Sequence, residues 1–496
     1  MQRRDSLKNL LFGLISFLVT TALGVLVPKL ILDAYQSEVN GLISSVRQFY
    51  SYFLLLEAGV GGAALQAMYA PMSRQDRGAL SGILSATAQF YRKTGLFYVL
   101  GVTLLSVLYP LLVDSELDKR LIFWIVAFQG AAGCARYFVM AKLQILLKVD
   151  NRTYVLSNLT TVFSVLSNLA RIVLILRGRS ILVVQGAFCL IDACQVIAAA
   201  VYVRRRYPWI DWHAQPDHRA ISQKSAVLVH QISSLVFSNT DTLILTFACG
   251  LKTVSVYAMY SLFYGLVASV IDVCSNSVSA VLGQLFHRDR ERFCRVQAVY
   301  ETVFLAICFA LFTLTYLFIL PVLGLYTAGA TDISYIDPYL PLLFTCMQVL
   351  NYGRITSNNL INFAGHFRQT QGRAIVEMAI NLAVSLICVG PFGIYGVLFG
   401  TIAALLYRTN DFIVYANRVI LGRSPWPTYR RWLLNAGLMA LCIALGSRLP
   451  IRAENYLRLL GWMVPCALAV GGIFLLGNLL AEHRAIGQFW RQWRKK

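Results

Sequence analysis

Long apolar stretches alternate with short polar segments along almost the whole chain. A helix needs about 20 predominantly apolar residues to cross a bilayer, so each stretch of that length is a candidate membrane span. Such stretches lie at about 7–32, 40–69, 93–113, 119–147, 154–176, 180–203, 224–249, 254–284, 297–325, 338–363, 372–391, 394–418, 430–447 and 457–481. The pattern predicts an all-α polytopic membrane protein with about fourteen transmembrane helices.

Composition leads to the same fold class. The chain has 496 residues, of which 57% are apolar and 14% are charged, whereas a typical soluble domain has about 25% charged residues. There is too little polar sequence to cover several soluble domains, and a disordered chain would be far less hydrophobic. The eleven cysteines lie singly in apolar stretches, which indicates small buried residues rather than disulfides or a metal site.

The distribution of basic residues predicts the orientation in the membrane. The net charge is +21, from 44 Lys and Arg against 23 Asp and Glu. With a cytoplasmic N-terminus, the inner segments carry 30 Lys and Arg and the outer loops carry eight. The positive-inside rule therefore predicts that both termini are cytoplasmic, and it explains the charge without a nucleic-acid partner.

The longest predicted cytoplasmic connection follows the sixth helix and suggests a division into two halves. The predicted domains are an N-lobe at 1–203, a cytoplasmic linker at 204–223, a C-lobe at 224–420, and a last segment at 421–496 with two helices and a basic tail. A shift of 217 residues aligns the first helix with the seventh and brings two basic loops into register. Six helices per half would make the halves parallel repeats.

Polar side chains recur at helical spacing on two of the predicted helices. They are Asn40, Ser44, Arg47 and Ser51 on the second helix, and Asn351, Arg354 and Asn358 on the tenth. A stripe with a central Arg and several amides is larger and wetter than helix packing requires, so we expect these residues to line a cavity and bind substrate. A Ser and Thr stripe on the fifth helix, which ends at Arg171, is more typical of helix packing.

Further ionisable groups lie within the predicted spans, where a charge at the helix centre costs about 2.5–3.5 kcal/mol. The candidates for ion coupling or gating are Asp241, Asp272, Glu57 and His230. Asp241 requires a cation partner, with Arg47 the first choice, or else protonation. His230 could instead hydrogen-bond a neighbour, and Glu57 could cap or gate the inner end of its helix.

Other charges are more simply explained as structural pairs. Arg408 and Asp411 lie one helical turn apart and are expected to satisfy each other. Asp192 could pair with Arg136 or with Arg171 on neighbouring helices.

Arginine is well suited to a pyrophosphate ligand, because its planar fork binds phosphate oxygens in a bidentate manner. A cavity with several Arg side chains, amides and hydroxyls suits a phosphate joined to a sugar chain better than an apolar drug.

Two stretches carry a resemblance to a known family. Residues 6–32, SLKNLLFGLISFLVTTALGVLVPKLIL, and 35–71, YQSEVNGLISSVRQFYSYFLLLEAGVGGAALQAMYAP, are similar to the opening of the Wzx-type oligosaccharide flippases. That opening has a "G-x-E-x-N-G-L" turn and a later "L-x-E-x-G", and Gln36 replaces its first Gly here. Residues 238–266, SNTDTLILTFACGLKTVSVYAMYSLFYGL, resemble the start of the family's second half. These flippases form the polysaccharide-transporter branch of the multidrug/oligosaccharidyl-lipid/polysaccharide (MOP) exporter superfamily.

The resemblance implies two six-helix lobes around a central cationic cavity, with two peripheral helices. It implies that an undecaprenyl-pyrophosphate-linked oligosaccharide is moved by alternating access between the leaflets of the bacterial cytoplasmic membrane, for surface polysaccharide biosynthesis. The partners would be the lipid-linked glycan, membrane lipids, and the polymerase and glycosyltransferases of that pathway. We expect no catalytic residue, cofactor or metal, and carry the family's cationic site over to Arg47 and Arg354. Lys29, at the outer end of the first helix, is a further candidate for binding the substrate.

Three alternatives stay open. A cation-coupled drug or metabolite antiporter of the same superfamily would need an acidic, aromatic-lined cavity, for which Asp241 and Asp272 are available. A lipid II flippase would be built in the same way. A membrane-embedded glycan polymerase would need catalytic acids on a large loop, and the predicted outer loops are short.

Overall fold

The computed structural model describes residues 2–53, 60–150, 152–212, 214–218, 227–449 and 454–483, with the side chains of 2–17 and 227–231 left out. The described residues form α-helices, two π-helical segments and connecting turns, and no β-strand occurs among them. Ten of these helices are long and apolar enough to cross a membrane. The prediction of an all-α polytopic membrane protein is therefore confirmed.

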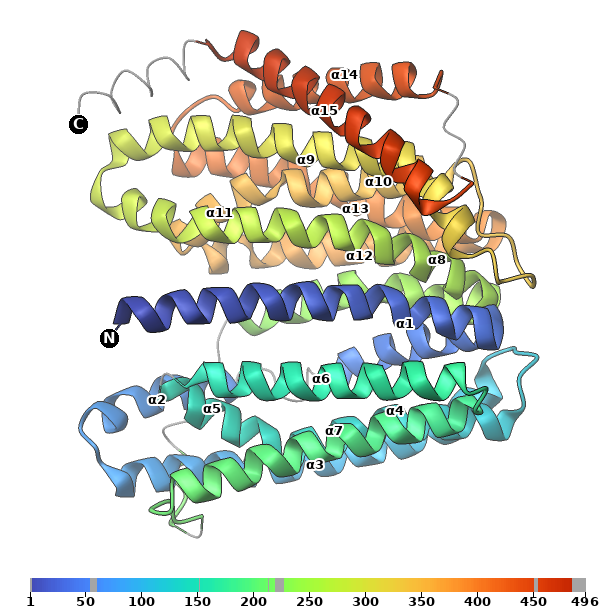
Figure 1. Cartoon of the computed structure of the whole chain (residues 1–496). Helices are drawn as coiled ribbons and strands as arrows, with labels where there is room; N and C mark the ends of the chain where they lie inside the picture. The colour runs from blue at the N-terminus through green and yellow to red at the C-terminus, as the bar shows by residue number, and fades with distance from the viewer. Residues whose placement is uncertain are drawn as a thin grey trace. The chain divides into compact units, whose positions relative to one another are not determined.

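The chain divides into two compact units, Met1–Ser255 and Val256–Lys496. The helices of the first are α1 (Gln2–Tyr52), α2 (Val60–Ser73), α3 (Arg77–Leu112), α4 (Lys119–Ala135), α5 (Ala141–Val149), α6 (Thr153–Leu176) and α7 (Ile181–Arg206), together with the first part of α8 (Val227–Arg288). A π-helical segment, Arg136–Met140, joins α4 to α5. Within this unit α3 packs on α4, α4 and α6 pack on α7, and α1 packs on α6 (Figure 1).

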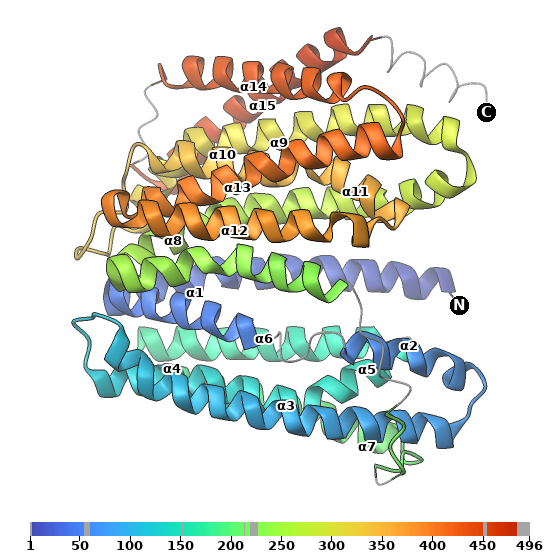
Figure 2. The ribbon, with the colours of Figure 1, turned by 180° about the vertical axis from the view of Figure 1, so that it is seen from behind.

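The second unit contains the rest of α8 and seven further helices. They are α9 (Arg290–Tyr326), α10 (Leu340–Gly353), α11 (Ile355–Ala364), α12 (Phe367–Phe392), α13 (Ile394–Tyr415), α14 (Trp426–Gly446) and α15 (Tyr456–Ala481), with a second π-helical segment, Ala416–Ile420, after α13. In this unit α12 packs along α13, and α14 and α15 both pack on α9 (Figure 2). The division into compact units falls inside α8, and the predicted lobes at 1–203 and 224–420 stay a prediction.

Two sharp kinks account for the length of α1 and α8. The backbone leaves helical geometry at Gln36, with φ 65° and ψ −176°, and at Gly250, with φ 78° and ψ 172°. Glycine adopts this region freely, whereas other residues almost never do. The kink in α8 separates the predicted spans 224–249 and 254–284. The kink in α1 separates the span 7–32 from the beginning of the span 40–69, the end of which lies in α2.

Aspartate caps set the beginnings of two long helices earlier than hydropathy indicates. Asp76 accepts a hydrogen bond of 2.9 Å from the backbone N–H of Ala79 and begins α3. Asp289 accepts one of 2.9 Å from Arg292 and begins α9. These caps stabilise polar first turns that hydropathy does not detect. The separation of the two caps along the chain is nearly equal to the separation of the two kinks. Both separations are slightly shorter than the 217-residue shift found in the sequence.

Candidate functional site: an arginine-lined cavity in the first unit

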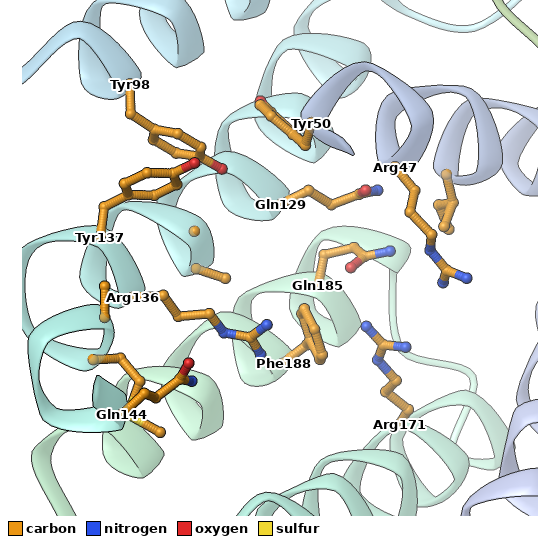
Figure 3. A pocket seen from close by; sticks show the side chains of 15 residues that line it. Arg47, Tyr50, Tyr98, Gln129, Arg136, Tyr137, Gln144, Arg171, Gln185 and Phe188 are labelled. Atoms are coloured by element: carbon orange, nitrogen blue, oxygen red, sulfur yellow. The ribbon is translucent and has the colours of Figure 1, made fainter. Parts of the chain in front are cut away.

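The first unit encloses a cavity of about 470 Å³. It is lined by Ile43, Arg47, Tyr50, Tyr98, Gln129, Ala132, Gly133, Arg136, Tyr137, Met140, Ala141, Gln144, Arg171, Gln185 and Phe188 (Figure 3). These residues come from α1, α3, α4, the π-helical segment, α5, α6 and α7. No Asp or Glu is among them, so the charged part of the lining that the structure describes is entirely basic.

Arg47 on α1 and Arg171 on α6 extend toward each other in this cavity (Figure 3). Arg47 is exposed although Leu42 and Val46 on the same helix are fully buried. Arg171 lies over the ring of Phe188 at 3.8 Å. Among the described residues, neither arginine has a carboxylate within ion-pair distance. Two like charges that face one cavity repel each other, and a bound anion would relieve that repulsion.

Arg136, the third arginine, has a carboxylate partner. Its Nη2 atom pairs with Asp192 on α7, and its Nε atom donates to the same carboxylate at 3.2 Å. The side chain of Asp192 is 4% exposed whereas that of Arg136 is 55% exposed. The sequence allowed two partners for Asp192, and the structure shows that Arg136 is the partner. The exposed part of the Arg136 guanidinium stays available to the cavity.

Uncharged polar groups complete the lining. The Nε2 atom of Gln129 and the Oε1 atom of Gln185 are buried and lack a hydrogen-bond partner among the described residues. Both side chains belong to the lining, although these two atoms are themselves closed off from the cavity. The rings of Tyr98 and Tyr137 lie tilted against each other, with 4.6 Å between their centroids, and form one wall. The cavity thus combines cations, amides and aromatic rings.

The other residues predicted on the first two spans do not line this cavity. Asn40 is 3% exposed, and its Nδ2 atom donates to Ser255 at 2.7 Å. Ser51 donates to the backbone carbonyl of Gln48 at 2.6 Å, and Ser44 is half-buried. Their part in substrate binding stays a prediction.

Lys29 is engaged within its own helix. Its Nζ atom lies 3.2 Å from a carboxylate oxygen of Asp33, one turn further along α1. The side chains are 27% and 33% exposed, so the pair contributes little to stability.

Arg354, in the second unit, belongs to an ion-pair network. Its Nη1 atom lies 2.5 Å from Glu377, and its Nη2 atom donates to Asn351 at 3.0 Å. Glu377 also lies 3.3 Å from Arg408, and Arg408 pairs with Asp411 at 2.9 Å. The predicted pairing of Arg408 with Asp411 is confirmed.

The ion-pair network around Arg354 is more typical of a structural residue than the surroundings of Arg47 are. Asn358 is half-buried, and its backbone N–H donates to the carbonyl of Arg354 at 3.0 Å. The binding of substrate by Arg354, Asn351 and Asn358 stays a prediction.

The structure describes the side chains of two of the four candidates for coupling or gating. Asp241 is 4% exposed in the first part of α8, and Asp272 accepts a hydrogen bond of 3.3 Å from the hydroxyl of Tyr352. Glu57 and the side chain of His230 lie outside the described residues. Their roles remain predictions.

The residues that sequence reasoning missed are Arg136, Arg171 and three glutamines of the lining. The spacing of Arg171 was interpreted as helix packing, and Arg136 as half of a structural pair. A charge count alone could have found both arginines, because each is an intramembrane cation in the same predicted half as Arg47.

Solved membrane transporters share the backbone arrangement of this chain. A structure of the lipid II flippase MurJ, in an inward closed conformation, matches with a TM-score of 0.68 and 14% identity, over 96% of this chain and 100% of that chain. An inward-facing multidrug resistance MATE family transporter of the MOP superfamily matches with a TM-score of 0.61 and 13% identity, over 80% and 93%. A structure of the MATE multidrug transporter DinF-BH matches with a TM-score of 0.58 and 14% identity, over 83% and 94%. This chain has the MurJ and MATE fold.

The MurJ-like match spans nearly the whole chain, from the N-terminal helices to the last two. Identities this low establish the fold alone, because one fold serves several substrates. No family model and no curated protein matches the sequence. The substrate must therefore be argued from the cavity.

Proposed function

We propose that this protein flips an undecaprenyl-pyrophosphate-linked oligosaccharide from the inner to the outer leaflet of the bacterial cytoplasmic membrane by alternating access. The observation that supports the proposal is the pair of arginines, Arg47 and Arg171, which face one cavity with no carboxylate of the described residues between them. A pyrophosphate supplies the missing negative charge, and each charge-assisted hydrogen bond contributes about 1.5–3 kcal/mol.

Each part of the lining suits one part of this substrate. Arg47, Arg171 and the exposed face of Arg136 would hold the phosphates, because guanidinium forks bind adjacent phosphate oxygens. Gln129 and Gln144, which are half-buried in the lining, would hydrogen-bond sugar hydroxyls through their amides. The tilted rings of Tyr98 and Tyr137 offer an apolar wall to a sugar face.

The proposal includes the predicted orientation, with both termini cytoplasmic, and the predicted contributions of Arg354 and Lys29. Such a flippase would act with the polymerase and glycosyltransferases of a surface-polysaccharide pathway. It would itself be a transporter and no enzyme.

Two other functions make different demands on the cavity. A drug or cation antiporter would need negative charge in its binding site, whereas this lining contains no Asp or Glu. Flipping of lipid II is the second candidate, because the match to the MurJ flippase covers almost all of both chains.

The decisive experiment is transport in proteoliposomes that contain the purified full-length protein. Fluorescent undecaprenyl-pyrophosphate oligosaccharide, lipid II, and a cationic dye would be offered separately. We expect the oligosaccharide lipid to be flipped, and the double variant Arg47→Ala/Arg171→Ala to lose flipping while folding normally. Arg177→Ala is the matched control, since this exposed arginine ends α6 outside the cavity.

Each alternative has its own outcome in this assay. Flipping of lipid II alone would assign the second candidate function. Transport of the cationic dye alone would overturn the proposal in favour of an antiporter.

A further inference from the structure

The first unit contains a second hollow, of about 570 Å³, that shares no lining residue with the first. It is lined by Ser85, Ala88, Gln89, Arg92, Val139, Lys142, Leu143, Ala200, Val203, Arg204, Trp212, Ala214, Gln215 and Pro216. These residues come from α3, the π-helical segment, α5, the last turns of α7, and the segment that follows α7. We call this the second cavity.

The segment after α7 contributes Trp212, Ala214, Gln215 and Pro216 to the lining and so forms one wall of the second cavity. The Tyr207 hydroxyl donates to Asp150 at 2.5 Å, and the Asp217 N–H donates to the carbonyl of Gly82 at 3.2 Å. A Cβ atom on Gly82 would lie 3.1 Å from the carbonyl oxygen of Gln215, so the close approach depends on this glycine. Residues 207–212 and 214–218 are thus held against the helices of the first unit by specific contacts, although their sequence suggested a simple linker.

Three cations from three helices converge on the second cavity. They are Arg92 on α3, Lys142 on α5 and Arg204 on α7. The Lys142 ammonium lies 5.0 Å from the centroid of the Trp212 ring, which orients it. Among the described residues, no Asp or Glu lines this cavity and no ion pair involves these three cations.

We propose that the second cavity is a separate anion site that binds the phosphate group of an anionic phospholipid headgroup. Basic pockets between the ends of membrane helices are suited to lipid phosphates. Two arginine forks and one ammonium supply more donors than a single phosphate can accept, and Gln89 and Gln215 add amide donors at the rim. A free phosphate ion has the same chemistry, so the experiment must separate the two sources.

The test measures binding of fluorescent phosphatidylglycerol to the purified full-length protein in neutral detergent, with phosphatidylcholine as the zwitterionic comparison. We expect saturable binding of phosphatidylglycerol and at least tenfold weaker binding of phosphatidylcholine. The variant Arg92→Gln/Lys142→Gln/Arg204→Gln should bind phosphatidylglycerol at least tenfold more weakly. Arg205→Gln is the matched control, because this neighbouring exposed arginine does not line the cavity.

Further variants keep the result independent of folding and of transport. The exposed Arg204 alone, changed to Gln, should weaken binding several-fold, and Lys142→Arg should retain it. Arg47→Gln/Arg171→Gln, in the first cavity, should leave phosphatidylglycerol binding unchanged even if it abolishes flipping. Failure of the flippase proposal is thereby distinguished from failure of this one.

Competition with inorganic phosphate identifies the source of the anion. Weak competition assigns the site to a lipid, and tight binding of phosphate without phosphatidylglycerol binding assigns it to the free ion. Unchanged binding in the folded triple variant, or equal binding of the two lipids, would overturn the proposal.

Discussion

The guanidinium groups of Arg47 and Arg171 face one another across the first cavity, with no carboxylate from the described residues between them (Figure 3). The repulsion between two like charges raises the free energy of the protein without substrate, and it is relieved when an anion binds. Binding sites commonly carry such strain, at the expense of stability.

Removal of one charge should therefore separate stability from transport. We expect Arg47→Gln to raise the free energy of unfolding by about 1 kcal/mol while it sharply reduces flipping. Thermal unfolding in detergent and the proteoliposome assay measure the two effects on one preparation. Arg177→Gln should change neither, and a variant that is less stable and still active would contradict the prediction.

The ion pair of Arg136 and Asp192 should respond in the opposite way. Asp192→Asn leaves the guanidinium without its buried partner, and we expect a loss of about 1–3 kcal/mol, moderated by the exposure of Arg136. Arg136→Gln/Asp192→Asn should recover part of that loss, because neither charge then lacks a partner. Purely additive effects in this double-mutant cycle would show that the pair contributes nothing.

Substrate binding by Arg354 and its ion pair with Glu377 can be tested separately. We expect Arg354→Ala to abolish transport and Arg354→Lys to retain part of it, because Lys keeps the charge and loses the fork. The protein should still fold, since Arg408 remains within 3.3 Å of Glu377. Suppose instead that Arg354→Ala unfolds easily and that Glu377→Gln in the same chain restores transport. Arg354 would then be half of a structural pair, with no role in binding.

Gln36 offers a test of backbone geometry that involves no substrate. Its φ of 65° with ψ −176° is a region that costs a residue other than glycine about 1–3 kcal/mol. We expect Gln36→Gly to raise the free energy of unfolding by about 1 kcal/mol. Gln48→Gly, within the helical part of α1, should lower it by a similar amount. Destabilisation by both substitutions would show that the kink is not strained.

Orientation in the membrane is testable by cysteine labelling from outside the cell. In a background without the eleven free cysteines, Thr331→Cys should react with an impermeant reagent and Gln215→Cys should not. The reason is the excess of basic residues on the predicted inner side. Reversed labelling would invert the predicted topology.

The sequence predicted the fold well because each span contains its own signal. A bilayer-length apolar stretch forms a helix whatever surrounds it, so hydropathy located the helices. It misplaced the beginnings of α3 and α9 because capping by Asp76 and Asp289 adds polar turns that hydropathy does not recognise.

The site was predicted only in part because it depends on several helices. Arg47 stood out on its own polar stripe, whereas Arg171 lies on a stripe that packing explains equally well. Only the fold brings Arg171 opposite Arg47 and directs Arg136 toward Asp192. Arg354 also stood out on a polar stripe in the sequence, but in the structure it takes part in a network of ion pairs.

The π-helical segment Arg136–Met140 lies within the span Lys119–Val149. It is a place where one residue could be deleted without changing the faces of the flanking helices. A π-bulge holds one more residue than a regular α-helix of the same length. Deletion of Val139 would restore a continuous α-helix and keep the residues on either side in register, whereas deletion within α4 would turn the helix by about 100°. The shortened protein should therefore insert and fold, with Arg136 still on the same face of the helix as before. The extra residue thus marks a place where this span can lose length while the residues on either side keep their faces.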